Sequence, residues 1–205
     1  MKAITTILIL KLVFALTSYG DEFLSSEEFS VSAIGTSFRI PDSWYKQNRE
    51  EWIGTIGRLD ESKEDIAALL ESREGAVYIA SLLKYDPSTR SGSIPAINMS
   101  LRKYSFSSPT IFLRYIEKVV ENQSRVFNNF EIVKYPELYV VSGKLAVRYK
   151  FQYDLHTSET GKSAIVTEGY ALPFDSAFLS VILAEEIPAQ HEALFKMMIQ
   201  SFEFK

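Results

Sequence analysis

The segment Leu145–Tyr153 alternates strictly between two kinds of side chain, and this pattern limits the fold more than any other feature of the chain. Leu145, Val147, Tyr149, Phe151 and Tyr153 alternate with Ala146, Arg148, Lys150 and Gln152. A period of two predicts a β-strand with one buried face and one wet or partly covered face. The polar stretch His156–Lys162 predicts a turn, and Ser163–Leu172 is the expected hairpin partner.

Other strand signals lie on both sides of this hairpin. Apolar or alternating runs predict strands at Phe29–Ile34, Ser37–Ile40, Val77–Tyr85, Ile97–Tyr104 and Ile132–Val141. Phe178–Ala184 is apolar on both faces, which predicts a strand in the centre of the sheet. The stretch Ser43–Gly57 has no clear period, and we expect it to be irregular.

Three segments have helical spacing. Asp60–Glu74 carries a narrow apolar stripe and ends at Gly75. Ser108 is an expected N-cap, and Pro109 stands at the first position of a helix whose apolar stripe runs to Phe127. Pro188 is expected to open a last helix. Because each helix lies between hairpin-spaced strands, the sequence predicts an α/β (α+β) fold with a mainly antiparallel sheet covered by helices.

The first 20 residues resemble a secretory signal peptide. Lys2 gives a positive start, Ile4–Leu16 is mostly apolar, and Ser18 and Gly20 place small residues before a cut at Asp21. The alternative is an uncleaved anchor, but a membrane-spanning helix needs about 20 apolar residues and this stretch is shorter. We therefore expect a periplasmic or secreted protein with a signal peptide at 1–20 and a single domain at 21–205.

The composition excludes several classes of site. The chain has 205 residues, no cysteine and two histidines, so disulfides, Cys-ligated zinc, iron–sulfur clusters and thiol catalysis are ruled out. Without Lys2 and Lys11 it has 20 basic against 26 acidic residues, a net charge of −6. We expect no nucleic-acid partner, because such proteins carry a basic patch or stripe. We also expect no cofactor and no metal.

Local catalytic motifs are incomplete. Gly161-Lys162-Ser163 ends like a phosphate loop, but His156 stands where the first glycine is required and two strands flank the segment. His191-Glu192 begins like a zinc-binding helix, but Phe195 replaces the second histidine. We expect both histidines to be exposed to solvent. No Gly-x-Ser-x-Gly turn is present.

Two groups of residues are candidates for binding. Trp44, Tyr45 and Trp52 would form an aromatic contact patch, although large aromatic residues are more often core residues. Glu185 and Glu186 end the central strand and would hold a cation, although charges on a loop are the commoner explanation for such a pair. The acids of Asp60–Asp65 are expected to favour the helix dipole.

Two short motifs resemble the PsbP-like superfamily. Phe38-Arg39-Ile40-Pro41-Asp42-Ser43-Trp44 is similar to its entry strand, and Ile199-Gln200-Ser201-Phe202-Glu203-Phe204 is similar to its C-terminus. The order of elements between them also agrees. The resemblance implies an α/β/α sandwich around an antiparallel sheet, with Pro41 turning the chain and Trp44 and Phe202 in the core. Family members include photosystem II extrinsic subunits, a Ran-binding protein and bacterial envelope proteins.

Three functions follow as hypotheses. The first is a non-enzymatic envelope protein that binds another protein or supports an assembly. The second is a hydrolase whose site is assembled across the fold. The third is a protein that binds a small apolar ligand or lipid in a cavity between a helix and the sheet.

Overall fold

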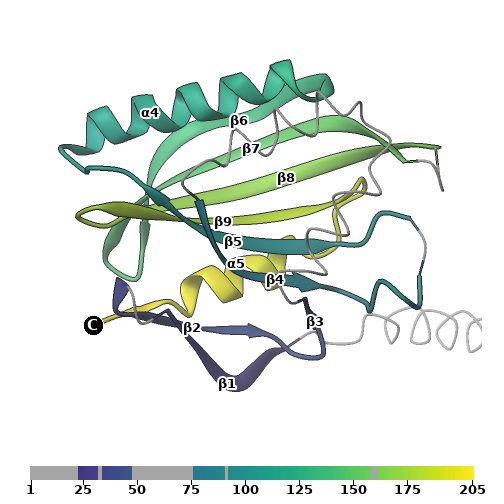
Figure 1. Cartoon of the computed structure of the whole chain (residues 1–205), viewed down its shortest axis with the longest axis horizontal. Coiled ribbons are helices and arrows are strands. Elements are labelled where there is room, and N and C mark those ends of the chain that lie inside the picture. The colour runs from purple at the N-terminus through teal and green to yellow at the C-terminus, as the bar shows by residue number, and fades with distance from the viewer. Residues whose placement is uncertain (1–22, 32–33, 48–75, 91, 158–160) are drawn as a thin grey trace, which may run out of the picture.

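A computed structural model of the chain describes residues 23–31, 34–47, 76–90, 92–157 and 161–205. Nearly half of these residues belong to a seven-stranded sheet with the strand order β3-β4-β5-β9-β8-β7-β6 (Figure 1). Its strands are β3 (Tyr45–Gln47), β4 (Ala76–Leu83), β5 (Ala96–Lys103), β6 (Asn128–Val141), β7 (Lys144–Thr157), β8 (Gly161–Pro173) and β9 (Ala177–Glu186). Every neighbouring pair is antiparallel.

A second, smaller sheet lies beside the large one. Its strand order is β1-β2-β10, with β1 at Leu24–Val31, β2 at Thr36–Pro41 and β10 at Glu203–Phe204. The C-terminus therefore returns to the first part of the described chain, where β10 pairs with β2 in antiparallel register. Phe38 of β2 stacks on Phe202, with ring centroids 4.4 Å apart, so the two motifs at opposite ends of the sequence pack on each other.

Two helices cover opposite faces of the large sheet (Figure 1). Helix α4 (Pro109–Glu121) packs Phe112, Ile116 and Val120 against β7, β8 and β9; a short 3₁₀ turn, η2 (Asn122–Arg125), follows it. Helix α5 (Glu192–Gln200) lies between the large and the small sheet. Its buried face consists of Leu194, Phe195, Met198 and Ile199. We call the two apolar clusters the α4-side core and the α5-side core.

The central strand β9 explains why the sheet needs a cover on both sides. Leu179, Val181 and Leu183 point into the α5-side core, whereas Phe178 points into the α4-side core. Successive side chains of a strand point to opposite faces. The prediction that Phe178–Ala184 is a central strand is confirmed, because β9 lies between β5 and β8.

Helix α4 begins as the sequence predicts. The Ser108 side chain accepts a hydrogen bond from the backbone N–H of Ile111, and Pro109 occupies the first turn. The last helix begins later than predicted. The strand β9 runs to Glu186, and α5 begins at Glu192 rather than at Pro188, because the Glu185 side chain bonds the backbone of Gln190 and His191 just before the helix.

The predicted fold class is confirmed as a mixed α/β (α+β) fold with an antiparallel sheet. The structure is mixed, antiparallel and dominated by strands. The layer on the α5 side contains more strand residues than helix residues, so the predicted α/β/α sandwich is not confirmed. Tyr45–Gln47 forms a short strand on β4 within the stretch we expected to be irregular. The predicted helix at Asp60–Glu74, the signal peptide at 1–20 and Trp52 lie outside the described residues.

Candidate functional site

The five predicted site residues occupy different environments. Trp44 is buried in the α5-side core, as the resemblance implied, and Tyr45 is half-buried on β3. Glu185 is only 3% exposed, whereas its neighbour Glu186 is exposed on the other face of β9. The two carboxylates therefore point apart, and Trp52 lies outside the described residues.

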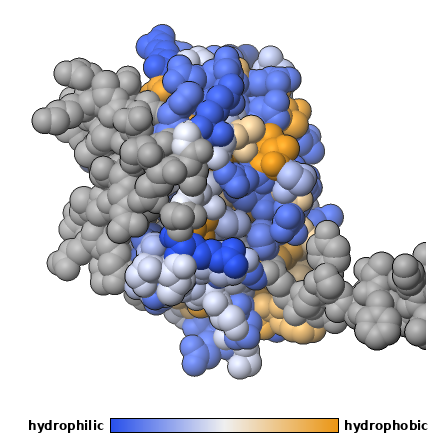
Figure 2. All heavy atoms as spheres, turned by 90° about the vertical axis from the view of Figure 1, so that its right-hand side faces the viewer, coloured by the Kyte–Doolittle hydropathy of each residue, from blue (hydrophilic) through white to orange (hydrophobic). Residues whose placement is uncertain are grey.

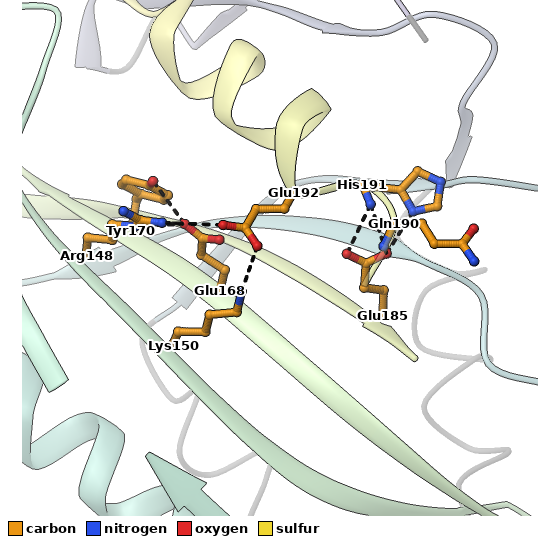
Figure 3. A network of polar contacts seen from close by, with 8 residues as sticks. All are labelled: Arg148, Lys150, Glu168, Tyr170, Glu185, Gln190, His191 and Glu192. Atoms are coloured by element: carbon orange, nitrogen blue, oxygen red, sulfur yellow. Dashed lines mark hydrogen bonds and ion pairs between the residues drawn. The ribbon is translucent and has the colours of Figure 1, made fainter. Parts of the chain in front are cut away.

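Glu185 and His191 form a buried pair at the start of α5 (Figure 3). Glu185 Oε2 accepts a hydrogen bond from Nδ1 of His191 at 2.8 Å and from the backbone N–H of Gln190 at 3.0 Å. The backbone N–H of His191 also points to this carboxylate, at 3.2 Å from Oε2. The carboxylate thus binds the backbone N–H groups next to the helix N-terminus, where negative charge is favourable.

These contacts set the protonation of Glu185. Burial by itself would raise the pKa of Glu185. The hydrogen bonds from the His191 ring and from the two backbone N–H groups lower the pKa, as does the charge of His191, and together they outweigh burial. The pKa of Glu185 therefore lies below its usual value, and the side chain is a carboxylate near neutral pH.

His191 connects two of the predicted residues. Its ring meets the ring of Trp44 edge-on, with centroids 5.5 Å apart, and the ammonium group of Lys84 lies 5.8 Å from the centroid of Trp44. Trp44 and Glu185 are therefore brought together by a histidine that we expected to be exposed. That expectation was wrong for His191, which is 8% exposed, and holds for His156.

A second polar network lies on the same face of the sheet, at the first turn of α5 (Figure 3). Arg148 of β7 binds Glu168 of β8 through Nε and Nη2, each 2.8 Å from Oε1. The hydroxyl of Tyr170 donates to the same carboxylate oxygen at 3.1 Å. Lys150 binds Glu192 of α5 at 2.9 Å. The network therefore joins β7, β8 and α5.

The geometry of this network is that of a structural ion pair. The side chains of Arg148 and Glu168 are 18% and 5% exposed, so each charge depends on the other for compensation. Burial raises the pKa of Tyr170 well above its usual value, and the negative charge of Glu168 raises it further. Tyr170 is therefore a hydrogen-bond donor at all ordinary pH values. The sequence showed only that Arg148 and Lys150 lie on the polar face of β7.

The buried carboxylate–imidazole pair is the feature that the hydrolase hypothesis requires, since hydrolases use such a carboxylate to orient a histidine. Here, however, the carboxylate oxygens also bind the backbone, and the imidazole is packed against Trp44. Among the described residues, no group of three His, Cys, Asp or Glu side chains is placed to hold a metal ion.

Aromatic rings fill the described part of the interface between α4 and the sheet. Phe112 lies 5.7 Å from Phe178, and Tyr104 lies 5.2 Å from Phe112, measured between ring centroids. Phe127 stacks on Tyr153 at 4.0 Å. Rings at these distances are in direct contact, so this region resembles a packed core more than the cavity that a lipid ligand requires.

An open groove of about 530 Å³ lies at the C-terminal end of α5. Arg39, Ser142, Ser201 and Glu203 contribute to its lining. The hydroxyl of Ser201 accepts from the backbone N–H of Arg39 at 2.9 Å and donates to the Met198 carbonyl, and the hydroxyl of Ser142 donates to the Gln200 carbonyl. These hydroxyls are therefore used to join α5 to β2 and to the β6–β7 turn.

Exposed apolar side chains gather on the edge strand β6. Half of the large apolar side chains that are exposed in the described part of the chain lie on this strand, namely Val133, Tyr135, Leu138 and Val140. The end of the molecule shown in Figure 2 differs, because its described surface is mostly hydrophilic with small apolar areas. No helix among residues 23–31, 34–47, 76–90, 92–157 and 161–205 is long and apolar enough to cross a membrane.

Register shifts explain why two of these side chains point outward. β6 slips against β7 three times, between Asn128 and Glu131, between Ile132 and Lys134, and between Lys134 and Glu137. Each slip adds a residue that has no partner on β7, and such bulges redirect side chains. Val133 and Tyr135 lie within the last two slips and are 50% and 69% exposed.

Comparison with known proteins gives similarity at the level of the fold. No family model matches the chain, and the search of curated proteins finds no match. The solution structure of cyanobacterial PsbP from Synechocystis sp. PCC 6803 has a TM-score of 0.48 and 13% identity, covering 93% of this chain and 99% of that chain.

Two further solved structures are similar. LpqN, described as involved in cell envelope biogenesis of Mycobacterium tuberculosis, has a TM-score of 0.43 and 12% identity, covering 82% of this chain and 81% of that chain. A protein of unknown function from Pseudomonas aeruginosa has a TM-score of 0.41 and 14% identity over 89% and 96% of the two chains. The structures similar to this chain thus include a PsbP, the family that the two sequence motifs resemble.

Proposed function

We propose that this protein is exported to the cell envelope, is not an enzyme, and acts as an accessory factor that binds another protein. The observation that carries the proposal is the concentration of exposed apolar side chains on β6. Exposed apolar groups that gather in one place mark interaction sites. The bulges place Val133 and Tyr135 outside the regular ladder, where a partner protein reaches them.

Two further observations support this function. The segment at 1–20 has the pattern of a secretory signal peptide, which agrees with an envelope location. The buried charged side chains that could take part in catalysis have structural roles instead. Glu185 and His191 hold the start of α5, and the carboxylate of Glu168 compensates the positive charge of Arg148.

Site-specific crosslinking tests the proposal. Because the chain has no cysteine, Tyr135→Cys gives a single position for a photo-crosslinker on the mature protein. Lys196→Cys, at an exposed position of α5, is the matched control. After irradiation in an envelope extract, we expect one defined protein adduct from position 135 and none of that mass from position 196.

The partner identified by mass spectrometry is then purified and its binding measured directly. We expect Tyr135→Glu to weaken that binding at least about tenfold, because aromatic residues are the commonest anchors of interfaces. The same adducts from both positions, or unchanged binding by Tyr135→Glu, would contradict the proposed surface.

A further inference from the structure

The C-terminal half of β6 is regular and open along its outer side. Glu137–Val141 pairs with β7 residue for residue, from Arg148 to Lys144, with no register shift. β6 ends the strand order of the large sheet, so its outer side has no strand partner in the part of the chain that the structure describes. Leu138 and Val140 are 46% and 62% exposed.

The turn after β6 fixes which backbone groups point outward. Ser142 and Gly143 have φ angles of 47° and 81°, as in the two-residue turns of tight hairpins. In such a hairpin the flanking residues, here Val141 and Lys144, direct their N–H and C=O groups toward each other. The direction alternates along an antiparallel strand, so Leu138 and Val140 direct theirs away from β7.

We propose that a second copy of this chain pairs with this edge, antiparallel, about a two-fold axis at Tyr139. In this register Leu138 of one copy faces the partner's Val140, and Val140 faces the partner's Leu138. Outward-directed backbone groups therefore meet outward-directed groups, and exposed apolar side chains meet each other. Tyr139 faces the partner's Tyr139 at a position without backbone hydrogen bonds.

The charges and the register shifts of β6 favour a closed dimer over an open fibre in which further copies add strands. Glu137 faces the partner's Val141, so no like charges oppose each other within the paired segment. Lys134, Pro136 and the register shifts lie directly before Glu137, and lysine, proline and bulges are the devices that end pairing at sheet edges. The two-fold arrangement uses the same segment of both copies and closes on itself, so it gives a dimer rather than a fibre.

The paired segment is short, so we expect the dimer to be weak. Stable interfaces bury about 1,200–2,000 Å² in total, and five residues from each copy bury less than this. We therefore expect a dimer that forms as the protein concentration rises and dissociates on dilution, visible by sedimentation velocity of the mature protein.

Charged residues introduced at positions 138 and 140 test the proposed register between the two copies. In the proposed pairing, position 138 faces position 140 of the other copy. The variant Leu138→Lys/Val140→Lys therefore opposes lysine to lysine, and Leu138→Glu/Val140→Glu opposes glutamate to glutamate. We expect each variant alone to be monomeric at concentrations where the unaltered protein is dimeric, and a one-to-one mixture of the two to form dimers again. Circular dichroism confirms that both variants are folded.

A cysteine provides a second measurement. Residues opposed at a position without backbone hydrogen bonds have Cα atoms about 4.5 Å apart, which suits a disulfide. Under mild oxidation we expect Tyr139→Cys to form a covalent dimer much faster than Val140→Cys, whose copies do not face each other. Met197→Lys, at an exposed apolar position on α5, is the control and is expected to leave the dimer unchanged.

Two results would overturn the inference. One is a monomer at every concentration tested, and the other is a dimer that persists in the lysine variant alone. The proposed protein partner is tested separately, through Tyr135, which lies outside the paired segment.

Discussion

At the scale of single residues, Gly169 shows how tightly the α4-side core is packed. Gly169 of β8 lies opposite Tyr149 of β7, and a Cβ atom at position 169 would lie 2.3 Å from Cζ of Tyr149. Tyr149 is only 6% exposed, and its hydroxyl bonds Ser180, so the ring cannot move without losing contacts.

We therefore expect Gly169→Ala to lower the free energy of unfolding by about 1–3 kcal/mol, the usual cost of overpacking a core. Urea denaturation measures this change. In a Tyr149→Leu background the shorter side chain leaves room for the methyl group, so the same substitution should cost much less. Equal costs in the two backgrounds would show that the Tyr149 ring is not the obstacle.

Arg148 and Glu168 give a second prediction at this scale. Arg148→Met leaves the carboxylate of Glu168 buried without its cation, and we expect a loss of about 3–5 kcal/mol in the free energy of unfolding. The double variant Arg148→Met/Glu168→Leu removes both charges and should recover much of this loss. A double variant as unstable as Arg148→Met, in urea denaturation at pH 7, would contradict the pairing.

At the scale of elements, the N-cap of α4 is the local signal that determines where this helix begins. Ser108 accepts a hydrogen bond from the backbone N–H of Ile111 at 3.3 Å. Ser108→Ala should lower the free energy of unfolding by about 1 kcal/mol, whereas Ser108→Asp keeps an acceptor and should be close to neutral. Ser107→Ala, at the exposed preceding position, is the control. A cost at position 107 equal to that at 108 would argue against the cap.

Helices and strands whose own sequence carries a clear periodicity or cap were predicted well. Those whose limits depend on contacts with residues distant in the sequence were not. The alternation of Leu145–Tyr153 and the cap of α4 are local, and both predictions are confirmed. The strand Tyr45–Gln47 exists because it pairs with β4, and no period in its own sequence shows this. The late start of α5 likewise depends on the Glu185 side chain.

At the scale of the whole molecule, Glu185 links stability to pH. Its pKa is lower in the folded protein than the ordinary value of 4.5, so the unfolded chain binds protons more readily. The stabilisation is therefore present above about pH 4.5 and is lost as the pH falls through the folded pKa. Glu192 contributes in the same direction, since its hydrogen bond with Lys150 lowers its pKa.

Unfolding measurements between about pH 3 and pH 7 test this link. Glu185→Gln should lower the free energy of unfolding at pH 7 by about 1–3 kcal/mol, the range for a lost charge-assisted bond, and should flatten the acid dependence. Glu186→Gln, at the exposed neighbouring position, should change neither quantity much. An unchanged acid dependence in Glu185→Gln would exclude this carboxylate as its source.

The candidate site shows the limits of prediction from sequence. Trp44 and Glu185 were singled out, but their common partner His191 was taken to be exposed, since nothing near it in the sequence indicates burial. Arg148 and Glu168 stand 20 positions apart, and only the pairing of β7 with β8 brings them together. The outward direction of Val133 and Tyr135 depends on register shifts between β6 and β7, which the sequence does not reveal.

The sequence by itself determined the class of fold and its antiparallel sheet, because periodicity, caps and turn residues act over a few neighbouring positions. It also determined the central place of β9, since a segment that is apolar on both faces must be covered on both. Only the tertiary structure decided which polar groups are buried together and which edge is left open. Those outcomes depend on strand register and on contacts between distant segments, and a short window of sequence carries information on neither.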